Sequence, residues 1–335
     1  LEVLSIVSVV PLIREFLSSP EKFTFFNNVR YLNAIDPIYV FILIFLFIHL
    51  FKFLYLFFFN YTQNKFINNL SANFTTRIFS NYLYRKYEAH TKNKTSIMLR
   101  NLITETKILC SSFINPIFTL IIETVIIIGI IIFLLTFKSD VALITAGIFL
   151  ILITIYSLSI KKYFSIWGSA RQSLNNITLK LSLDGLYGIK DIMIYAKESI
   201  FRKKFINNEY EFARVSKKYQ TFQQLPRLVF EFIVIFFLIL LIFFLKVKGI
   251  TNNNILEIVG VFAIAGIRFV PSSSRIIGSL QMIRFGTPSL NSILSENILS
   301  TEYYTNLEIK TDKNLEYKFK DSIVLNNISF SYESN

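Results

Sequence analysis

The sequence predicts an all-α membrane protein with six crossings, and three observations lead to this prediction. Hydrophobic residues make up 53% of the chain, charged residues only 17%, and the mean hydropathy is +0.50. One water-soluble core could not bury that many apolar side chains. The apolar residues are gathered in long runs, and the polar connections between these runs contain few prolines or glycines to interrupt a helix.

Five apolar runs are long enough to cross the hydrocarbon core of a bilayer, which takes about 20 helical residues. They cover residues 38–59, 117–137, 141–160, 228–247 and, in a more broken form, 255–280. Residues 1–17 lack the charged start and the cleavage signal of a signal peptide, so we interpret them as the end of a further helix. We expect this first span to be incomplete.

The connections alternate between short and long. Those at 18–37, 138–140 and 248–254 are short, whereas 60–112 and 161–227 are long and polar. Continuation of the helices out of the membrane explains the long ones: a helix from Ile38 to about Arg85 would be ~70 Å long, more than twice the hydrocarbon thickness. Both long hairpins and the C-terminus then protrude on one face, which we expect to be cytoplasmic.

The first short connection predicts an amphipathic helix on the outer leaflet. Ser19 suits the cap position and Pro20 the first helical position. One face of this helix would carry apolar residues toward the lipid, which makes a plain interfacial anchor one possible role. These residues are Phe25, Phe26, Val29 and Leu32.

The C-terminal residues change character and predict a β-hairpin. Apolar residues alternate on both sides of an Asn-Asn pair, as in two short strands joined by a turn; they are Ile323, Leu325, Ile328, Phe330 and Tyr332. A lone hairpin is marginal in water, so we expect it to begin a larger domain. This divides the chain into a transmembrane domain at 1–300 and a linker with the start of the next domain at 301–335.

Two arginines stand within the last apolar run. Arg268 and Arg275 are seven residues apart, which on a helix is 700° of rotation, so both lie on one face about 10 Å apart, with Ser272 between them. An arginine at bilayer depth costs about 2.5–3.5 kcal/mol unless it meets water, a partner or a ligand. We therefore expect them to line a cavity; snorkelling to an interface, or pairing with Glu123 and Glu231, are the alternatives.

Two further basic residues extend this argument. Lys52 interrupts the second span, with His49 one turn earlier, and a wet interior or a carboxylate would explain it. Arg227 opens the fifth span, either as part of the cavity or as an intrahelical pair with Glu231 four residues later. His49 by itself is typical of packing or of a hydrogen bond.

These side chains predict a positive interior, with Glu123 as its internal counter-ion. Such an interior suits an anionic cargo, because arginine holds phosphate oxygens with paired hydrogen bonds. The candidate substrate-binding residues are Lys52, Arg227, Arg268, Arg275 and Ser272.

The chain carries no motif for chemistry of its own. It has no glycine-rich phosphate loop with Lys-Ser or Lys-Thr, no His/Cys metal cluster and no credible Ser/His/Asp trio. We expect it neither to hydrolyse ATP nor to hold a metal, and we expect no nucleic-acid partner. Its one cysteine, Cys110, excludes an internal disulfide and is expected to be a buried small residue.

The order of these features resembles an ABC exporter: six crossings with long hairpins, followed by "SIVLNNISFSY" as the first strands of a nucleotide-binding domain. The segment "GLYGIKDIMIYAKESIFRKKF", residues 185–205, is similar too. The resemblance implies a homodimer, ATP with Mg²⁺ in the full-length protein and none bound by this part alone, and Tyr332 stacking on adenine. It also implies short coupling helices at the hairpin tips, which we place by position at 86–98 and 212–221; for each segment a solvated basic loop is the alternative.

A narrower resemblance is to the lipid-linked oligosaccharide flippase of bacterial N-glycosylation. "VVPLI" near the start, "LPRLVFEF" at 225–232 and "GIRFVPSSSRII" at 266–277 carry it. It implies a multi-pass protein of the bacterial inner membrane that moves a polyprenyl-pyrophosphate glycan, with the outer helix engaging the lipid tail of the cargo.

Other functions stay open at this point. The same fold could export a peptide, a protein or a drug. A membrane glycosyltransferase would be expected to show acidic metal-binding motifs, which are not seen, and a non-catalytic membrane scaffold would assemble partners only.

Overall fold

The computed structural model describes residues 37–85, 87, 90, 94–137, 139–249, 252–307, 322, 324 and 326–329. The partial first span and the outer helix with Phe25, Phe26, Val29 and Leu32 lie outside these residues. Tyr332 lies outside them as well.

Five helical rods make up the described part. The elements are α3 (Pro37–Tyr84), α5 (Thr95–Arg100), η1 (Asn101–Glu105), α6 (Thr106–Leu109), η2 (Cys110–Ile114), α7 (Asn115–Phe137), α8 (Ser139–Tyr187), α9 (Ile189–Ile194), α10 (Glu198–Val247) and α11 (Asn252–Leu307). The elements from α5 to α7 follow one another without a break, and η1 and η2 are π-helical turns, which hold one residue more than an α turn.

Each complete span predicted from the sequence lies inside a helix. The prediction for 117–137 is met by α7, and the helix expected from Ile38 to about Arg85 is α3, which ends at Tyr84. With 48 to 56 residues, α3, α8, α10 and α11 are each more than ~70 Å long, so they must extend beyond a bilayer. The sequence pattern predicts this because the two long connections contain few prolines or glycines.

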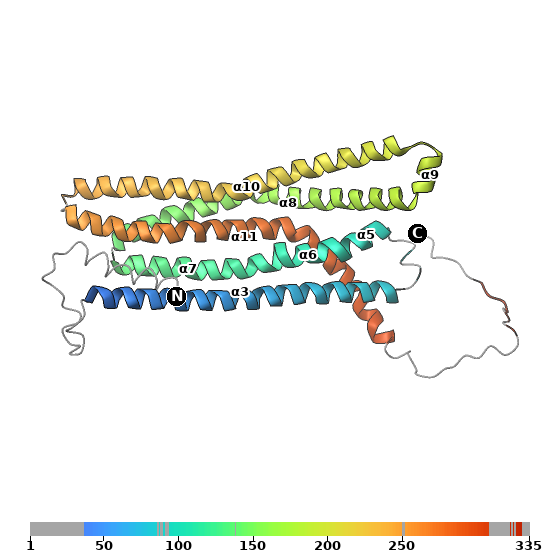
Figure 1. Ribbon diagram of the computed structural model, residues 1–335, viewed down its shortest axis with the longest axis horizontal. Helices are drawn as coiled ribbons and strands as arrows, with labels where there is room; N and C mark the ends of the chain where they lie inside the picture. Colours follow the sequence, from blue (N-terminus) through green and yellow to red (C-terminus); the bar gives the residue numbers. More distant parts are fainter. Residues whose placement is uncertain are drawn as a thin grey trace.

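The rods form one elongated bundle with α11 in its middle (Figure 1). The helices α8 and α10 lie along one side of α11, and α7 and α3 along the other. The short helices α5 and α9 lie at one end of the bundle, whereas α10 ends and α11 begins at the opposite end (Figure 1). We call the first of these the tip end, because both long hairpins turn there.

Two hydrophobic cores hold the bundle together. The larger one joins α7, α10 and α11 through residues such as Ile130, Phe230 and Val261, each at most 2% exposed. The smaller one joins α3, α6 and α11 through Ile78, Leu109 and Ile293. Because α11 contributes to both cores, it connects the half of the bundle nearer the tip end to the half farther from it.

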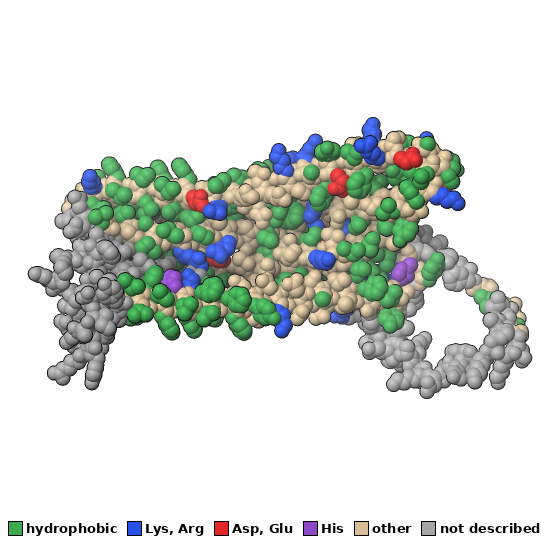
Figure 2. Space-filling view, viewed as in Figure 1, with side chains coloured by type: hydrophobic (Ala, Val, Ile, Leu, Met, Phe, Trp, Pro, Cys, Tyr) green, Lys and Arg blue, Asp and Glu red, His purple; other side chains and the backbone are tan. Residues whose placement is uncertain are grey.

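The outward faces of the rods are apolar over much of their length. Four helical stretches among the described residues are long and apolar enough to cross a membrane: Ile42–Tyr84, Thr95–Thr136, Glu198–Val247 and Ile258–Ser295. Figure 2 shows many apolar side chains along the visible face of the bundle. Water would disfavour such a surface, and lipid explains it.

One predicted coupling segment was placed wrongly. Residues 212–221 lie well inside α10, and the turn of the second hairpin is formed by α9, with Gly188 before it and Ala196 after it. The backbone of Ala196 is left-handed, at φ 49°, which lets the chain reverse into α10. The first predicted segment, 86–98, does lie where the hairpin of α3 and α5 turns, although the structure describes only part of it.

The predicted C-terminal β-hairpin is not supported. The described residues between 322 and 329 form no strand, and Asn327 occupies a bend at φ 50°. A short hairpin needs further strands to cover its apolar face, and none is present among the described residues to do so. The helix α11 continues to Leu307, across the predicted boundary at residue 300, and the division into domains stays a prediction.

Candidate binding site at membrane depth

The arginine and serine stripe predicted on the last span forms one turn-by-turn series on α11. Ser272 is fully buried, Arg268 is partly buried, and the side chain of Arg275 is 46% exposed. The hydroxyls of Ser272 and its neighbour Ser273 are buried and hydrogen-bond no described residue. The stripe therefore faces a neighbouring helix at the serines and reaches more open space at Arg275.

Arg275 contacts a carboxylate on the neighbouring helix α7. Its Nε atom lies 3.0 Å from Oε1 of Glu123 and also donates a longer hydrogen bond, 3.4 Å, to the carbonyl of Pro271. The Glu123 side chain is only 5% exposed, so the pair consists of a buried anion and a half-exposed cation. Glu123 is thus the internal counter-ion that the sequence predicted.

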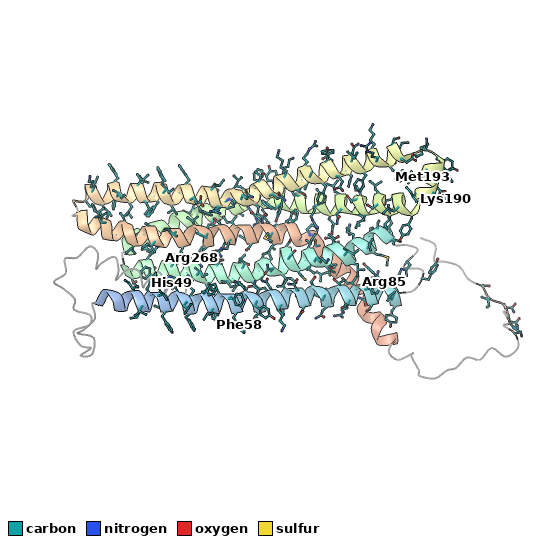
Figure 3. The ribbon with its side chains drawn as sticks, viewed as in Figure 1. His49, Phe58, Arg85, Lys190, Met193 and Arg268 are labelled. Carbon is teal, nitrogen blue, oxygen red and sulfur yellow. The ribbon has the colours of Figure 1, made fainter. Side chains whose placement is uncertain are left out.

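Two basic residues stand on α3 at a similar level along the bundle. His49 and Lys52 are three residues apart, hence on one face of the helix, and both are partly buried. Figure 3 shows His49 of α3 and Arg268 of α11 at nearly the same position along the long axis. His49 hydrogen-bonds the carbonyl of Phe45 through Nδ1, at 3.0 Å, and packs on the Phe45 ring, which confirms the modest role expected for it.

Arg227 occupies a different setting. It lies on α10, where its Nε atom is 2.8 Å from Oε1 of Glu231, and the two side chains are 74% and 44% exposed. The intrahelical pair left open by the sequence is therefore formed, on the outer surface of that helix. A role for Arg227 in binding stays a prediction.

We define the basic cluster as Lys52, Glu123, Arg268, Ser272 and Arg275. The cluster contains three basic side chains and one carboxylate at bilayer depth, and the carboxylate pairs with Arg275. Figure 2 shows basic side chains gathered beside a histidine between the apolar bands of the rods. Such a site can hold an anion, because its cations are only partly buried and remain within reach. The low dielectric constant of the surroundings also makes the attraction between cation and anion stronger than in water.

A second charged group, nearer the tip end, was not foreseen. Glu105 of η1 is fully buried, and its Oε2 atom lies 3.1 Å from Nη2 of Arg171 on α8. The hydroxyl of Ser289 on α11 donates to the same carboxylate and accepts a hydrogen bond of 3.0 Å from Arg171. Arg100 stands 3.7 Å from the other oxygen of Glu105. We call Glu105, Arg100, Arg171 and Ser289 the neck cluster.

Aromatic rings pack on the neck cluster. The guanidinium of Arg171 lies 5.4 Å from the ring centre of Phe285, and Phe285 stacks on Tyr219 of α10 with ring centres 3.9 Å apart. Gln172 adds hydrogen bonds to the carbonyl of Pro288 and to Ser292 on α11. The neck cluster thus ties α8, α10 and α11 to the helix that contains η1.

The sequence offered no signal for the neck cluster. Glu105 and Arg171 lie in the two long polar connections, where charges are expected to be solvated, and 66 residues separate them. Only the packing of the two hairpins against α11 removes water from them. Among the described residues there is no group of three or more His, Cys, Asp or Glu side chains that could hold a metal ion.

Comparison with known proteins agrees with this architecture. A family model described as the ABC transporter transmembrane region matches residues 15–267. Among solved structures, a bacterial Atm1-family ABC exporter with ATP bound is similar over 89% of this chain and 52% of that one, at a TM-score of 0.63 and 13% sequence identity. The chain therefore spans about half the length of that exporter, and at this identity the likeness concerns the fold.

Proposed function

From the premise that this chain belongs to the ABC transporter transmembrane region family, we propose that it is the membrane half of an ATP-driven exporter or flippase for an anionic lipid-linked oligosaccharide or a similar glycolipid. The observation that carries the choice of cargo is the basic cluster at bilayer depth. An exporter of apolar molecules would have no use for three basic side chains there, because each cation at this depth raises the cost of inserting the helices.

The chemistry of the cluster fits a pyrophosphate. Guanidinium groups hold phosphate oxygens through paired, charge-assisted hydrogen bonds, and Lys52 adds a compact positive charge from the opposite helix. Ser272 and Ser273 contribute hydroxyls that hydrogen-bond no described residue. The lipid tail of such a cargo would lie along the apolar faces of the rods, while its charged head group would lie at the basic cluster.

Hydrolysis of ATP belongs to another part of the protein in this proposal. The chain has no glycine-rich phosphate loop, so ATP and Mg²⁺ would bind in the ATPase domain of the full-length protein, with Tyr332 stacking on adenine. Two copies would face one another across the pathway in the bacterial inner membrane, with the tip end in the cytoplasm, and the hairpin tips would carry the motion of the ATPase domains to the bundle.

The test uses the full-length protein reconstituted in lipid nanodiscs. A polyprenyl-pyrophosphate glycan should stimulate ATP hydrolysis. Arg268→Ala and Lys52→Ala should each raise its half-maximal concentration by about 10- to 100-fold, the value of one or two charge-assisted contacts. Arg214→Ala is the matched control, because Arg214 pairs with Glu211 on the exposed surface of α10. Stimulation by peptides, with none by the glycan, would reject the glycolipid cargo and leave an exporter of another kind.

A further inference from the structure

We propose that Glu123 is a stand-in for the anionic group of the cargo: it holds Arg275 until a phosphate arrives and is then displaced from it. This inference rests on the proposed function and concerns the regulation of the same site. It makes Glu123 a residue that sets how tightly the site holds an anion and how readily it lets the anion go.

The first support is the position of the carboxylate. Glu123 lies within the apolar run of α7, it is 4% exposed, and its Oε2 atom hydrogen-bonds no described residue. A buried carboxylate costs free energy unless hydrogen bonds and ion pairs compensate for its lost hydration. This one satisfies one oxygen and leaves the other without a hydrogen-bond donor among the described residues.

The second support is the asymmetry of the pair. Arg275 uses its Nε atom for Glu123, while 46% of its side chain remains exposed. A guanidinium carries five N–H donors. An incoming anion can therefore reach Arg275 from its open side, whereas Glu123 is shielded between α7 and α11. The exposed partner is the cation, which is the arrangement that an anion-binding site requires.

The third support is a contrast within the same chain. Arg227 and Glu231 make an ion pair of similar length, 2.8 Å, but both partners are on one helix and both are well exposed. Solvent would separate such a pair at little cost. The pair of Arg275 with Glu123 joins two helices at the basic cluster, so that exchanging its anion changes what links α7 to α11.

A displaceable carboxylate has a defined effect on transport. While Glu123 competes for Arg275, the cluster binds an anion less tightly than three cations alone would. The same competition helps to expel the anion, since the carboxylate returns to the arginine as the phosphate leaves. Without the carboxylate the site should bind more tightly and release more slowly.

The experiment compares Glu123→Gln with wild-type protein, both full-length and in nanodiscs, with a polyprenyl pyrophosphate as the probe. Glutamine keeps the shape and removes the charge. We expect the half-maximal concentration for stimulation of ATP hydrolysis to fall about tenfold and the maximal rate to fall as well, which separates tighter binding from slower release. Glu211→Gln makes the same change of charge on the exposed surface of α10, where Glu211 pairs with Arg214, and should shift neither value more than about twofold.

Two additions keep the result decisive. Glu123→Asp retains a charge that reaches Arg275 less well, so its half-maximal concentration should lie between those of wild type and Glu123→Gln; if the glutamine variant does not fold, the aspartate variant alone decides. An unchanged or higher value in these variants, with wild type still stimulated, overturns the role of Glu123 and leaves the proposed function standing. A wild type that ignores the pyrophosphate rejects both.

Discussion

At the scale of single residues, Glu105 has the most enclosed charge among the described residues. Its side chain is 0% exposed, and it is held by Arg171, by Ser289 and, at longer range, by Arg100. Three groups from three helices thus share one carboxylate. Breaking such a group by removing one partner leaves the others buried without compensation, which costs more than the group contributes while intact.

Glu105→Ala should therefore destabilise the protein by about 3–5 kcal/mol, because two arginines lose their carboxylate in a buried place. The measurement is the midpoint of thermal unfolding in detergent. The control is Glu211→Ala, whose partner Arg214 is exposed and whose pair should contribute at most about 0.5 kcal/mol. Equal shifts for both variants would contradict the buried role of Glu105.

The sequence identifies some of the buried charged residues and not others, and the reason is physical. Charges inside apolar runs stand out, so Lys52, Arg268 and Arg275 were identified, and the two acids within reach, Glu123 and Glu231, proved to be paired with arginines. Charges in polar connections do not stand out. Whether Glu105 and Arg171 meet water or each other depends on how two hairpins pack, and no spacing along one chain contains that information.

At the scale of helices, α11 is the element against which the others are fitted. It passes through Pro271 and Pro288 without a break, and Figure 1 shows it changing direction toward its C-terminal end, which is the end nearer Pro288. Two glycines allow close approach beside the neck cluster: a Cβ on Gly168 of α8 would collide with the carbonyl of Phe285, and one on Gly286 would lie 2.9 Å from the carbonyl of Ser112.

Gly286→Ala should therefore force η2 away from α11, at a cost of about 1–3 kcal/mol, the usual range for overpacking. Gly278→Ala on the same helix is a matched control, since a Cβ there would meet nothing within 4 Å. It should leave stability unchanged or raise it by about 0.5–1 kcal/mol through the better helix propensity of alanine. Thermal unfolding of both variants decides, and a destabilised Gly278→Ala with an unaffected Gly286→Ala would reverse the assignment.

The sequence predicts that the helices exist, but it does not predict where the chain turns between them. Length and apolarity placed every complete span, because the bilayer sets both. Position along the connection predicts the turn at 212–221, whereas the chain reverses at α9, between Gly188 and Ala196. The β-hairpin was predicted from alternation alone, which cannot show whether partner strands are present.

At the scale of the whole molecule, the second hairpin is a stiff lever that ends in α9. Asn208 of α10 donates hydrogen bonds to the carbonyl of Leu174 and to Thr178 on α8, at 3.1 and 2.8 Å, and so clasps the two arms. At the tip, Met193, Ile194 and Tyr195 are 63%, 66% and 71% exposed. Three large apolar residues in a row at a tip that lies outside the bilayer indicate a docking surface.

Under the proposed function, that surface would receive the ATPase domain of the full-length protein. Replacing Met193 and Ile194 together by serine in the full-length protein should lower the amount of cargo moved per ATP hydrolysed by about tenfold, because apolar docking area is lost. Folding should be unaffected, as both side chains are exposed. Tyr210→Ser, on α10 and 74% exposed but away from the tip, should change this ratio by less than about twofold. Reconstituted vesicles that report transport and hydrolysis together provide the measurement, and an equal loss in both variants would exclude docking at α9.

The π turns η1 and η2 have a consequence for anyone who compares this chain with its relatives. Each π turn inserts about one extra residue into its helix, so the residues that follow are shifted by one position relative to the faces of a regular α-helix. Positions beyond Ile114 are therefore offset by about two from a regular 3.6-residue count begun at Thr95. A relative that lacks one of these turns would present a different side of the helix at Glu123, even where an ungapped alignment pairs the same letters.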